Sequence, residues 1–271
     1  FHLVAPQAWA WREGRVHQLR RNVTELHCIF PFEEDFFRSR GVNAHYIGHP
    51  LARAVRPSLG RSEFFSRHRI PDGRPLVALC PGSRRGEIER HLPVLRAAVE
   101  RIAAERACTF LLAAPAGSRD RFGISFFEPL CGAGRVRYCE GETRDAMAHA
   151  DLTIAASGTV TTEAALLGSP MVIFYRVHPL TWRLGRPFVR VPYFSIVNLV
   201  AGREIAPELI QHDCNGERLA SEALRLLSSE EARLAMRAQL ARVREALLTD
   251  RDPCEVSAAR IAAFLNREVS A

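Results

Sequence analysis

Two short glycine-containing turns, each lying between a mostly apolar run and a helix-like segment, constrain the fold of this chain most. The run at residues 74–80 ends at Pro81-Gly82-Ser83-Arg84, called here the first turn. The run at residues 151–156 ends at Ser157-Gly158-Thr159, the second turn. A buried strand, a tight turn and a helix in succession are typical of α/β proteins with parallel sheets. Two such units predict a nucleotide site at the carboxyl ends of parallel strands.

The second turn contains the groups that bind phosphate at the start of a helix. Its backbone N–H groups and the hydroxyls of Ser157 and Thr159, on either side of Gly158, would face the positive end of a helix dipole. Glu163 follows about one helical turn later, where a carboxylate could accept hydrogen bonds from ribose hydroxyls. The alternative interpretation is an ordinary N-cap followed by a solvated glutamate.

The first turn adds a cation to these groups. Arg84 provides a planar, permanently charged group that suits a diphosphate, and Gly82 and Ser83 allow the backbone to approach a ligand closely. The segment after this turn has apolar residues at helical spacing, namely Ile88, Leu92, Leu95, Val99 and Ile102. Pro93 interrupts the pattern, which predicts that the first helical turns form a separate short piece.

The wider chain also alternates between strands and helices. Before a turn-rich connector at 49–60, strands are expected at 1–5, 25–30 and 44–47, and helices at 11–23 and 31–40. After it, further strands are expected at 109–114, 136–138, 152–155 and 171–174, and helices at 218–248 and from Pro253 onward. The three prolines between residues 178 and 192 predict an irregular loop.

Composition and residue spacing exclude several kinds of site. No apolar run approaches the roughly 20 residues that span a bilayer. The net charge of +7 favours an anionic partner, but the 37 basic residues, all arginine, do not form the dense runs typical of nucleic-acid tails. No nucleic-acid partner is therefore expected. The seven cysteines and ten histidines show neither C-x-x-C nor H-E-x-x-H spacing, so we expect no disulfide framework and no metal site. Asp252 is expected to cap the helix that begins at Pro253 rather than to bind a metal ion.

Six segments together resemble a known family. They are Pro6-Gln-Ala-Trp-Ala-Trp-Arg12, Gly48-His-Pro-Leu51, Leu79-Cys-Pro-Gly-Ser-Arg84 with Glu87, Ala156-Ser-Gly-Thr159 with Glu163, Pro170-Met-Val-Ile-Phe-Tyr-Arg176 and Asn198-Leu-Val-Ala-Gly-Arg-Glu204. This ordered set resembles the bacterial lipid-A-disaccharide synthases from residue 1 to about residue 215. The tryptophan-rich and asparagine-led segments are specific to that family, whereas Ser-Gly-Thr with a following glutamate is shared more widely.

The resemblance implies a GT-B architecture, in which two Rossmann-like domains with parallel sheets face a cleft. Residues 1–58 would be the later part of the acceptor-side domain plus a linker, and residues 59–249 the domain that binds a UDP-sugar. Residues 250–271 would be a helix that crosses back to the first domain. Because the chain has no initiator methionine and opens on a strand, we expect it to be the carboxy-terminal part of a longer protein whose first domain is incomplete here.

The reaction implied by the resemblance joins UDP-2,3-diacylglucosamine to 2,3-diacylglucosamine 1-phosphate and releases UDP, with inversion at the anomeric centre and without a cofactor. Gly82, Ser83, Arg84 and the second turn would hold the diphosphate, and Glu163 the ribose. Asn198, expected in a loop, would orient the diphosphate or the acceptor; its alternative is a turn or cap residue. The family's general base is expected upstream of Phe1, with Glu13 as the only weak substitute, so the chain alone is expected to be inactive.

The same resemblance implies where such a protein acts and with what. It predicts a cytoplasmic enzyme of lipid A biosynthesis, peripheral on the inner face of the inner membrane of a Gram-negative cell. Trp9 and Trp11 could contact acyl chains or the phospholipid surface, or could be core residues. A homodimer is left open. The alternatives are another GT-B enzyme of UDP-GlcNAc, such as the peptidoglycan GlcNAc transferase or a 2-epimerase, and a basic Rossmann-like protein that binds nucleotide or RNA.

Overall fold

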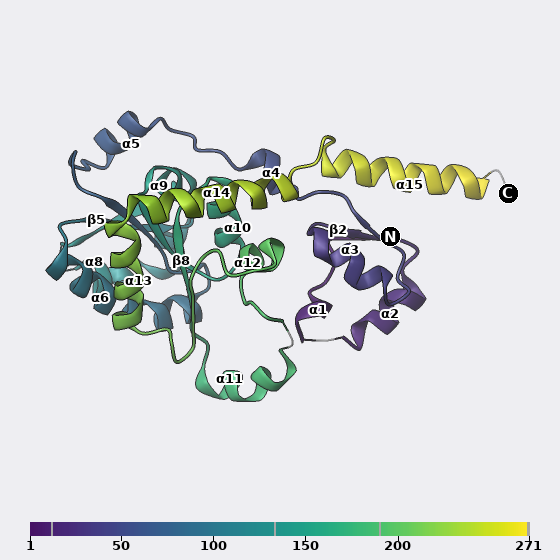
Figure 1. Ribbon diagram of the computed structural model, residues 1–271, viewed down its shortest axis with the longest axis horizontal. Helices are drawn as coiled ribbons and strands as arrows, with labels where there is room; N and C mark the ends of the chain where they lie inside the picture. Colours follow the sequence, from purple (N-terminus) through teal and green to yellow (C-terminus); the bar gives the residue numbers. More distant parts are fainter. Residues whose placement is uncertain (12, 133, 190, 270–271) are drawn as a thin grey trace. The chain divides into compact units, whose positions relative to one another are not determined.

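The computed structural model describes residues 1–269 except residues 12, 133 and 190. The chain divides into two compact units (Figure 1). Unit 1 consists of residues 1–54, 183–192 and 242–271, and unit 2 of residues 55–182 and 193–241. Each unit contains one parallel sheet, so each is described by itself.

Unit 2 is built around a six-stranded sheet in which every neighbouring pair is parallel. Its order is β6-β5-β4-β7-β8-β9, with bounds β4 Leu76–Cys80, β5 Thr109–Ala114, β6 Val136–Glu140, β7 Leu152–Ala156, β8 Met171–Tyr175 and β9 Glu208–Ile210. Strands β4, β5 and β7 are buried along their whole length, as expected for a parallel sheet covered on both faces. Five of the six strands match the sequence predictions. The three-residue β9 was missed because so short a segment has no clear period.

The helices of unit 2 connect these strands. They are α5 Arg61–Arg67, α6 Arg85–Glu105, α7 Ser118–Phe122, the 3-10 helix η1 Ile124–Phe127, α8 Glu128–Cys131, α9 Thr143–His149, α10 Thr159–Leu166, α12 Ile196–Ala201 and α13 Gly216–Ser228. Helix α6 runs without a break through Pro93, so the predicted separate first piece is wrong. An interior proline costs about 3 kcal/mol, whereas burying each of Ile88, Leu92 and Leu95 contributes about 1.5–3 kcal/mol, and all three are buried.

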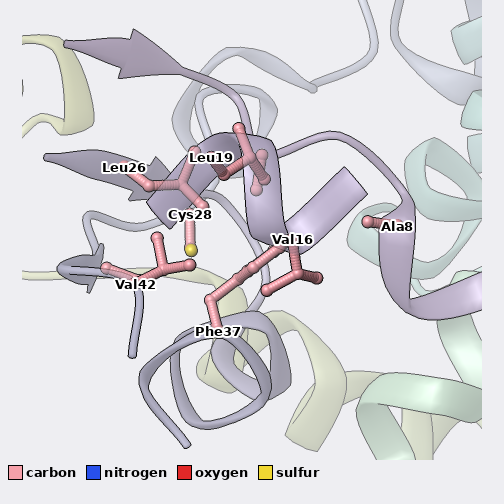
Figure 2. Packing of buried hydrophobic residues seen from close by; sticks show 9 residues of the cluster. Ala8, Val16, Leu19, Leu26, Cys28, Phe37 and Val42 are labelled. Carbon is pink, nitrogen blue, oxygen red and sulfur yellow. The ribbon is translucent and has the colours of Figure 1, made fainter. Parts of the chain in front are cut away.

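Unit 1 has a smaller parallel sheet of three strands in the order β1-β2-β3. Its bounds are β1 His2–Leu3, β2 Leu26–Cys28 and β3 Ala44–Tyr46, and its short helices are α1 Ala8–Trp11, α2 Arg15–Asn22, α3 Pro31–Arg38 and α4 Leu51–Ala54. Figure 2 shows the core, in which Leu19 and Phe37 from two helices lie near Leu26 and Cys28 of β2. Strand β1 is shorter than the predicted 1–5, although the alternation of strand and helix is as predicted.

Glu33 is the main buried charge of unit 1. Its carboxylate accepts hydrogen bonds from Trp9 Nε1 at 3.0 Å and from the backbone N–H groups of Ile29 at 3.2 Å and Phe30 at 3.1 Å, at the start of α3. Burial nevertheless dominates and raises the pKa of Glu33 to about 7. Trp9 is partly buried against the core, whereas Trp11 is 49% exposed.

Helix α15 (Pro253–Val269) packs on the strands of unit 1. Ser257 Oγ lies 2.7 Å from His27 Nδ1, and the Arg260 guanidinium pairs with Glu25. Asp252 Oδ1 accepts from the backbone N–H of Cys254 at 2.8 Å and of Glu255 at 3.3 Å, which confirms its predicted role as N-cap.

Two helices begin in unit 2 and end in unit 1, α11 (Pro179–Gly185) and α14 (Glu230–Leu247). The irregular loop predicted for 178–192 is wrong over much of its length, since α11 is followed by the 3-10 helix η2 (Arg186–Phe188). Pro179 is the first residue of α11 and Pro187 lies at the start of η2, where a missing N–H costs no hydrogen bond. Within the described part of the chain, no helix has both the length and the apolar character needed to cross a bilayer.

Candidate functional site

The two turns identified in the sequence lie side by side in unit 2. Strands β4 and β7 are parallel neighbours, with Cys80 in register with Ala155, so their carboxyl ends lie at the same edge of the sheet. A side chain at Gly82 would begin 3.9 Å from the Cβ of Ala156, which shows how closely the first turn approaches the end of β7. The structure therefore brings the two predicted phosphate-binding turns together.

Gly82 allows the tight conformation of the first turn. Its φ is +110°, a region that residues with a side chain rarely adopt. A Cβ at this position would also lie 3.1 Å from Oε2 of Glu87, which is tighter than most real contacts. A side chain at residue 82 would therefore strain the first turn and crowd Glu87.

Glu87, in the first turn of α6, orients the cation of the first glycine-containing turn. Its Oε1 accepts from Arg84 Nη1 at 3.0 Å and from the Tyr175 hydroxyl, at the end of β8, at 2.8 Å. Burial would raise the pKa of Glu87, but the hydrogen bonds from Tyr175 and Arg84 outweigh it and hold the pKa below its ordinary value. Burial and the bond to Glu87 raise the pKa of Tyr175 to about 12. Arg84 itself remains 80% exposed, so its guanidinium is accessible to a ligand.

His91 joins the first turn to the end of β8. The ring is buried; Nδ1 lies 2.7 Å from the carbonyl oxygen of Pro81, and Nε2 accepts from the backbone N–H of Arg176 at 3.1 Å. These partners require the neutral tautomer with its proton on Nδ1. Burial lowers the pKa of His91, which favours the same neutral form. The sequence analysis did not identify His91, whose only signal was its place on the apolar face of α6.

The second turn ends at the first residue of α10. Thr159 begins the helix and Gly158 is its N-cap, without a side-chain cap bond. The backbone N–H groups of the first helical turn are not capped by a side chain and can face a ligand. Gly158 and Thr159 are exposed, and Ser157 is half-buried with its backbone N–H bonded to the carbonyl of Phe174 at 2.9 Å.

Glu163 lies on α10 and is held by an arginine that the sequence analysis missed. Arg144, near the start of α9, donates to Oε1 of Glu163 from Nε at 3.0 Å and from Nη2 at 2.8 Å. Both bonds go to the same oxygen; among the described residues no group donates to Oε2. The Glu163 side chain is 17% exposed. Its carboxylate is therefore fixed at one oxygen and available at the other.

Asn198 lies in the short helix α12, which packs against α10, and not in the loop expected from the sequence. Both polar atoms of its buried side-chain amide are hydrogen-bonded. Nδ2 donates to the carbonyl of Ala206 at 2.8 Å and to Glu208 Oε1 at 2.7 Å. Oδ1 accepts from the backbone N–H groups of Ile205 at 2.9 Å and Ala206 at 3.1 Å. In this conformation Asn198 joins α12 to the start of β9, and its predicted contact with the diphosphate or acceptor stays a prediction.

Glu13, the weak candidate for a general base, belongs to unit 1. Its Oε1 lies 2.6 Å from Nη2 of Arg40, with both side chains partly exposed. The adjacent Arg12 of the tryptophan-rich segment lies outside the described residues.

Comparison with known proteins identifies close relatives. A family model described as lipid-A-disaccharide synthetase matches residues 1–261. The lipid-A-disaccharide synthase of Solibacter usitatus (strain Ellin6076) is 55% identical over 246 residues, covering 91% of this chain and 64% of that protein. The lipid-A-disaccharide synthase of Geobacter sulfurreducens is 40% identical over 250 residues, covering 92% and 64%. The chain thus spans less than two thirds of the length of these relatives.

The fold is also similar to solved structures. The crystal structure of Anabaena Alr3699/HepE in complex with UDP and glucose has a TM-score of 0.53 at 12% identity, covering 94% of this chain and 66% of that chain. At this identity the likeness concerns the fold alone. Together with the two parallel sheets, it confirms the predicted α/β class of GT-B type.

Proposed function

Because this chain belongs to the lipid-A-disaccharide synthetase family, we propose that it contains the UDP-sugar site of an inverting glycosyltransferase. The reaction joins UDP-2,3-diacylglucosamine to 2,3-diacylglucosamine 1-phosphate and gives lipid A disaccharide 1-phosphate and UDP. The observation that carries the proposal is the meeting of the first and second turns at the carboxyl ends of β4 and β7. In open parallel sheets this edge is where nucleotides bind.

The diphosphate of the UDP-sugar is held by charge and by helix geometry. The start of α10 supplies backbone N–H groups and a positive dipole end, Ser83, Ser157 and Thr159 supply hydroxyls, and Arg84 supplies the cation. As the bond from the anomeric carbon to the diphosphate breaks, negative charge grows on the departing UDP. Groups already directed at that charge lower the barrier, and no metal ion is needed in this scheme.

Glu163 holds the ribose of the nucleotide. Arg144 fixes Oε1, so Oε2 keeps a defined position and can accept hydrogen bonds from ribose hydroxyls. Because the Glu163 carboxylate is already oriented, its side chain loses little conformational entropy when Oε2 binds the ribose.

Activation of the acceptor requires groups other than those that hold the diphosphate and the ribose. A general base must remove the proton of the acceptor 6-hydroxyl, and we place that base upstream of Phe1. Asn198 would orient the diphosphate or the acceptor. Residues 1–58 would belong to the acceptor-side domain, 59–249 to the UDP-sugar domain, and 250–271 to the crossing helix. The enzyme would act in the cytoplasm at the inner face of the inner membrane, where its acylated substrates lie.

Two measurements test this proposal. Titration calorimetry should show that the chain of 271 residues binds UDP in the presence of EDTA, yet radiolabelled UDP-2,3-diacylglucosamine should give no disaccharide. Expressing the chain together with the segment encoded upstream of it should restore turnover. Disaccharide synthesis by the chain alone would refute the upstream base and make Glu13 the first residue to substitute. Failure of the complete protein to make disaccharide, with turnover of UDP-GlcNAc instead, would favour the 2-epimerase or peptidoglycan alternative.

A further inference from the structure

Three side chains of metal-binding type, none of them part of the first or second turn, come together from separate segments of unit 2. His68 follows the last residue of α5, Cys139 lies in β6, and Glu142 precedes α9. Each residue offers one potential ligand atom, and these three atoms lie within 4.8 Å of one another. Among the described residues, no other group of three His, Cys, Asp or Glu side chains meets this criterion. His68 Nε2 lies 2.6 Å from Glu142 Oε2 and 3.8 Å from Cys139 Sγ. This set is called here the HCE cluster.

Local structure holds the HCE cluster in place. Gly141 has φ +79°, and the turn that this conformation allows brings Cys139 and Glu142 to one side of the chain. The His68 ring packs on Phe64, with ring centroids 4.6 Å apart. Arg67 Nη1 donates to the other oxygen of Glu142, Oε1, at 2.7 Å, which leaves Oε2 directed at His68. A carboxylate held by a second hydrogen bond is the usual arrangement around a metal ligand.

We propose that the HCE cluster is a zinc-binding site, with His68 Nε2, Cys139 Sγ and Glu142 Oε2 as ligands and a water molecule in the fourth position. Imidazole, thiolate and carboxylate are the three ligand types that Zn²⁺ takes in proteins, and three protein ligands with one water is a common zinc coordination. Magnesium and calcium take oxygen ligands only and do not fit this set.

The observed distances are close to those of a zinc site. With bonds of about 2.0 Å to nitrogen or oxygen and 2.3 Å to sulfur, tetrahedral geometry separates ligand atoms by roughly 3.3–3.6 Å. The 3.8 Å between Cys139 Sγ and His68 Nε2 needs only a small contraction. The 2.6 Å between His68 Nε2 and Glu142 Oε2 is a hydrogen bond, and its proton occupies the space between two ligand atoms. Zinc would displace the thiol proton to solvent, and the proton between His68 and Glu142 would move to Nδ1 of His68, which leaves a neutral imidazole bound through Nε2.

The charges around the cluster also match a divalent cation. A Cys139 thiolate and the Glu142 carboxylate together carry two negative charges, which one Zn²⁺ neutralises. Three other charged groups lie nearby: Arg67 is bound to Glu142, Arg137 Nη1 donates to the backbone carbonyls of His68 and Arg69, and Asp145 Oδ1 accepts from the backbone N–H groups of Ser58 and Leu59 at 2.6 Å each.

Such a site would cross-link α5 to the turn between β6 and α9. Without metal, the contacts among these three residues are the hydrogen bond between His68 and Glu142 and the longer contact of 3.8 Å between His68 Nε2 and Cys139 Sγ. Because α9 carries Arg144, which holds Glu163, the metal would restrain the segment behind the ribose-binding carboxylate. The metal would hold this segment in place and take no part in the glycosyl transfer, and its water-filled fourth position distinguishes it from the all-protein coordination of most structural zinc sites.

The test is metal binding by the chain of 271 residues under reducing conditions. We expect one Zn²⁺ per chain in equilibrium dialysis, and with Co²⁺ an absorption band from sulfur-to-metal charge transfer. Cys139→Ser and His68→Gln should each weaken zinc binding by at least about 100-fold, since losses in the second shell alone cost about 10–100-fold. Cys131→Ser is the matched control, because Cys131 is a half-buried free thiol outside the cluster. It should leave binding unchanged.

A second measurement, the unfolding temperature with and without Zn²⁺, tests the proposal even if some variants fold poorly. One equivalent of Zn²⁺ should raise the unfolding temperature of the unaltered chain, and EDTA should reverse the rise. Glu142→Gln, which can still accept a hydrogen bond, should abolish the rise, and lower pH should weaken binding because protons compete for the ligands. Absence of saturable binding to the unaltered chain would overturn the proposal. Equal binding by Cys139→Ser, His68→Gln and Cys131→Ser would also overturn it, showing adventitious binding elsewhere.

Discussion

Substitution of Arg84 by alanine is the sharpest test of the diphosphate site. The Arg84 guanidinium is 80% exposed and has one ion pair, with Glu87 at 3.0 Å. An exposed pair of this kind contributes about 0–1 kcal/mol to folding, so the variant should fold normally. Glu87 keeps its hydrogen bond from Tyr175, and the first turn keeps its bond from His91. Any change in UDP affinity should therefore report on the ligand contact.

The expected loss of UDP affinity follows from the chemistry of the contact between Arg84 and the diphosphate. A hydrogen bond to a charged group is worth about 1.5–3 kcal/mol, which corresponds to a UDP affinity about 10- to 150-fold weaker. Glu87 already neutralises part of the Arg84 charge, and the side chain is well solvated, so the loss should lie in the lower half of this range.

Arg85→Ala provides a matched control for this experiment. Arg85 is adjacent in sequence, is also exposed, and has a similar ion pair, with Glu89 at 3.0 Å. Titration calorimetry with UDP in EDTA should show a loss for Arg84→Ala and less than a twofold change for Arg85→Ala. Equal losses in the two variants would mean that only the general charge of α6 matters. Unchanged affinity in Arg84→Ala, or binding that requires Mg²⁺, would refute the assignment.

Three further predictions concern other residues. Glu163→Gln should weaken UDP binding but leave pyrophosphate binding nearly unchanged, because only ribose contacts are lost; equal losses in calorimetry would point to folding instead. Asn198→Ala should lower the free energy of unfolding by about 2–4 kcal/mol in urea, because it leaves several buried polar groups without partners, and in the complete enzyme it should reduce kcat more than UDP affinity. Glu33 has a pKa of about 7 in the folded state against an ordinary 4.5, so its contribution to stability is present below pH 4.5 and lost as pH rises through 7. Relative to Glu33→Gln, the unaltered chain should therefore lose about 3 kcal/mol between pH 4 and 8; a constant difference over that range would contradict the buried charge.

The sequence predicted the parts of this structure that depend on local pattern. Five strands of unit 2 and the two turns follow from apolar runs that end in glycine-containing segments. Pro93 was misleading because the free energy that an interior proline costs is smaller than the free energy gained by burying the apolar side chains of the helix around it. Pro179 and Pro187 were misleading because a proline has a different effect at the start of a helix than in its interior.

The contacts that organise the site depend on tertiary structure and could not be predicted in this way. Glu87 was visible as part of a motif, but its bond to Tyr175 joins residues 88 positions apart. Arg144 and Glu163 meet only because α9 and α10 are neighbours. The HCE cluster combines His68 with a segment about 70 residues later, so a search for short metal-binding spacings does not find it.

The bridge made by His91 has a consequence for the energetics of ligand binding. The imidazole ties the backbone of the first turn to the strand two positions away in the sheet, through a ring that can neither flip nor gain a proton without losing a bond. The entropy of ordering the phosphate-binding backbone is then lost once, when the chain folds, and not again each time a nucleotide arrives. A site built in this way should release its product without relaxing, so each catalytic cycle would begin from the same arrangement of the first turn.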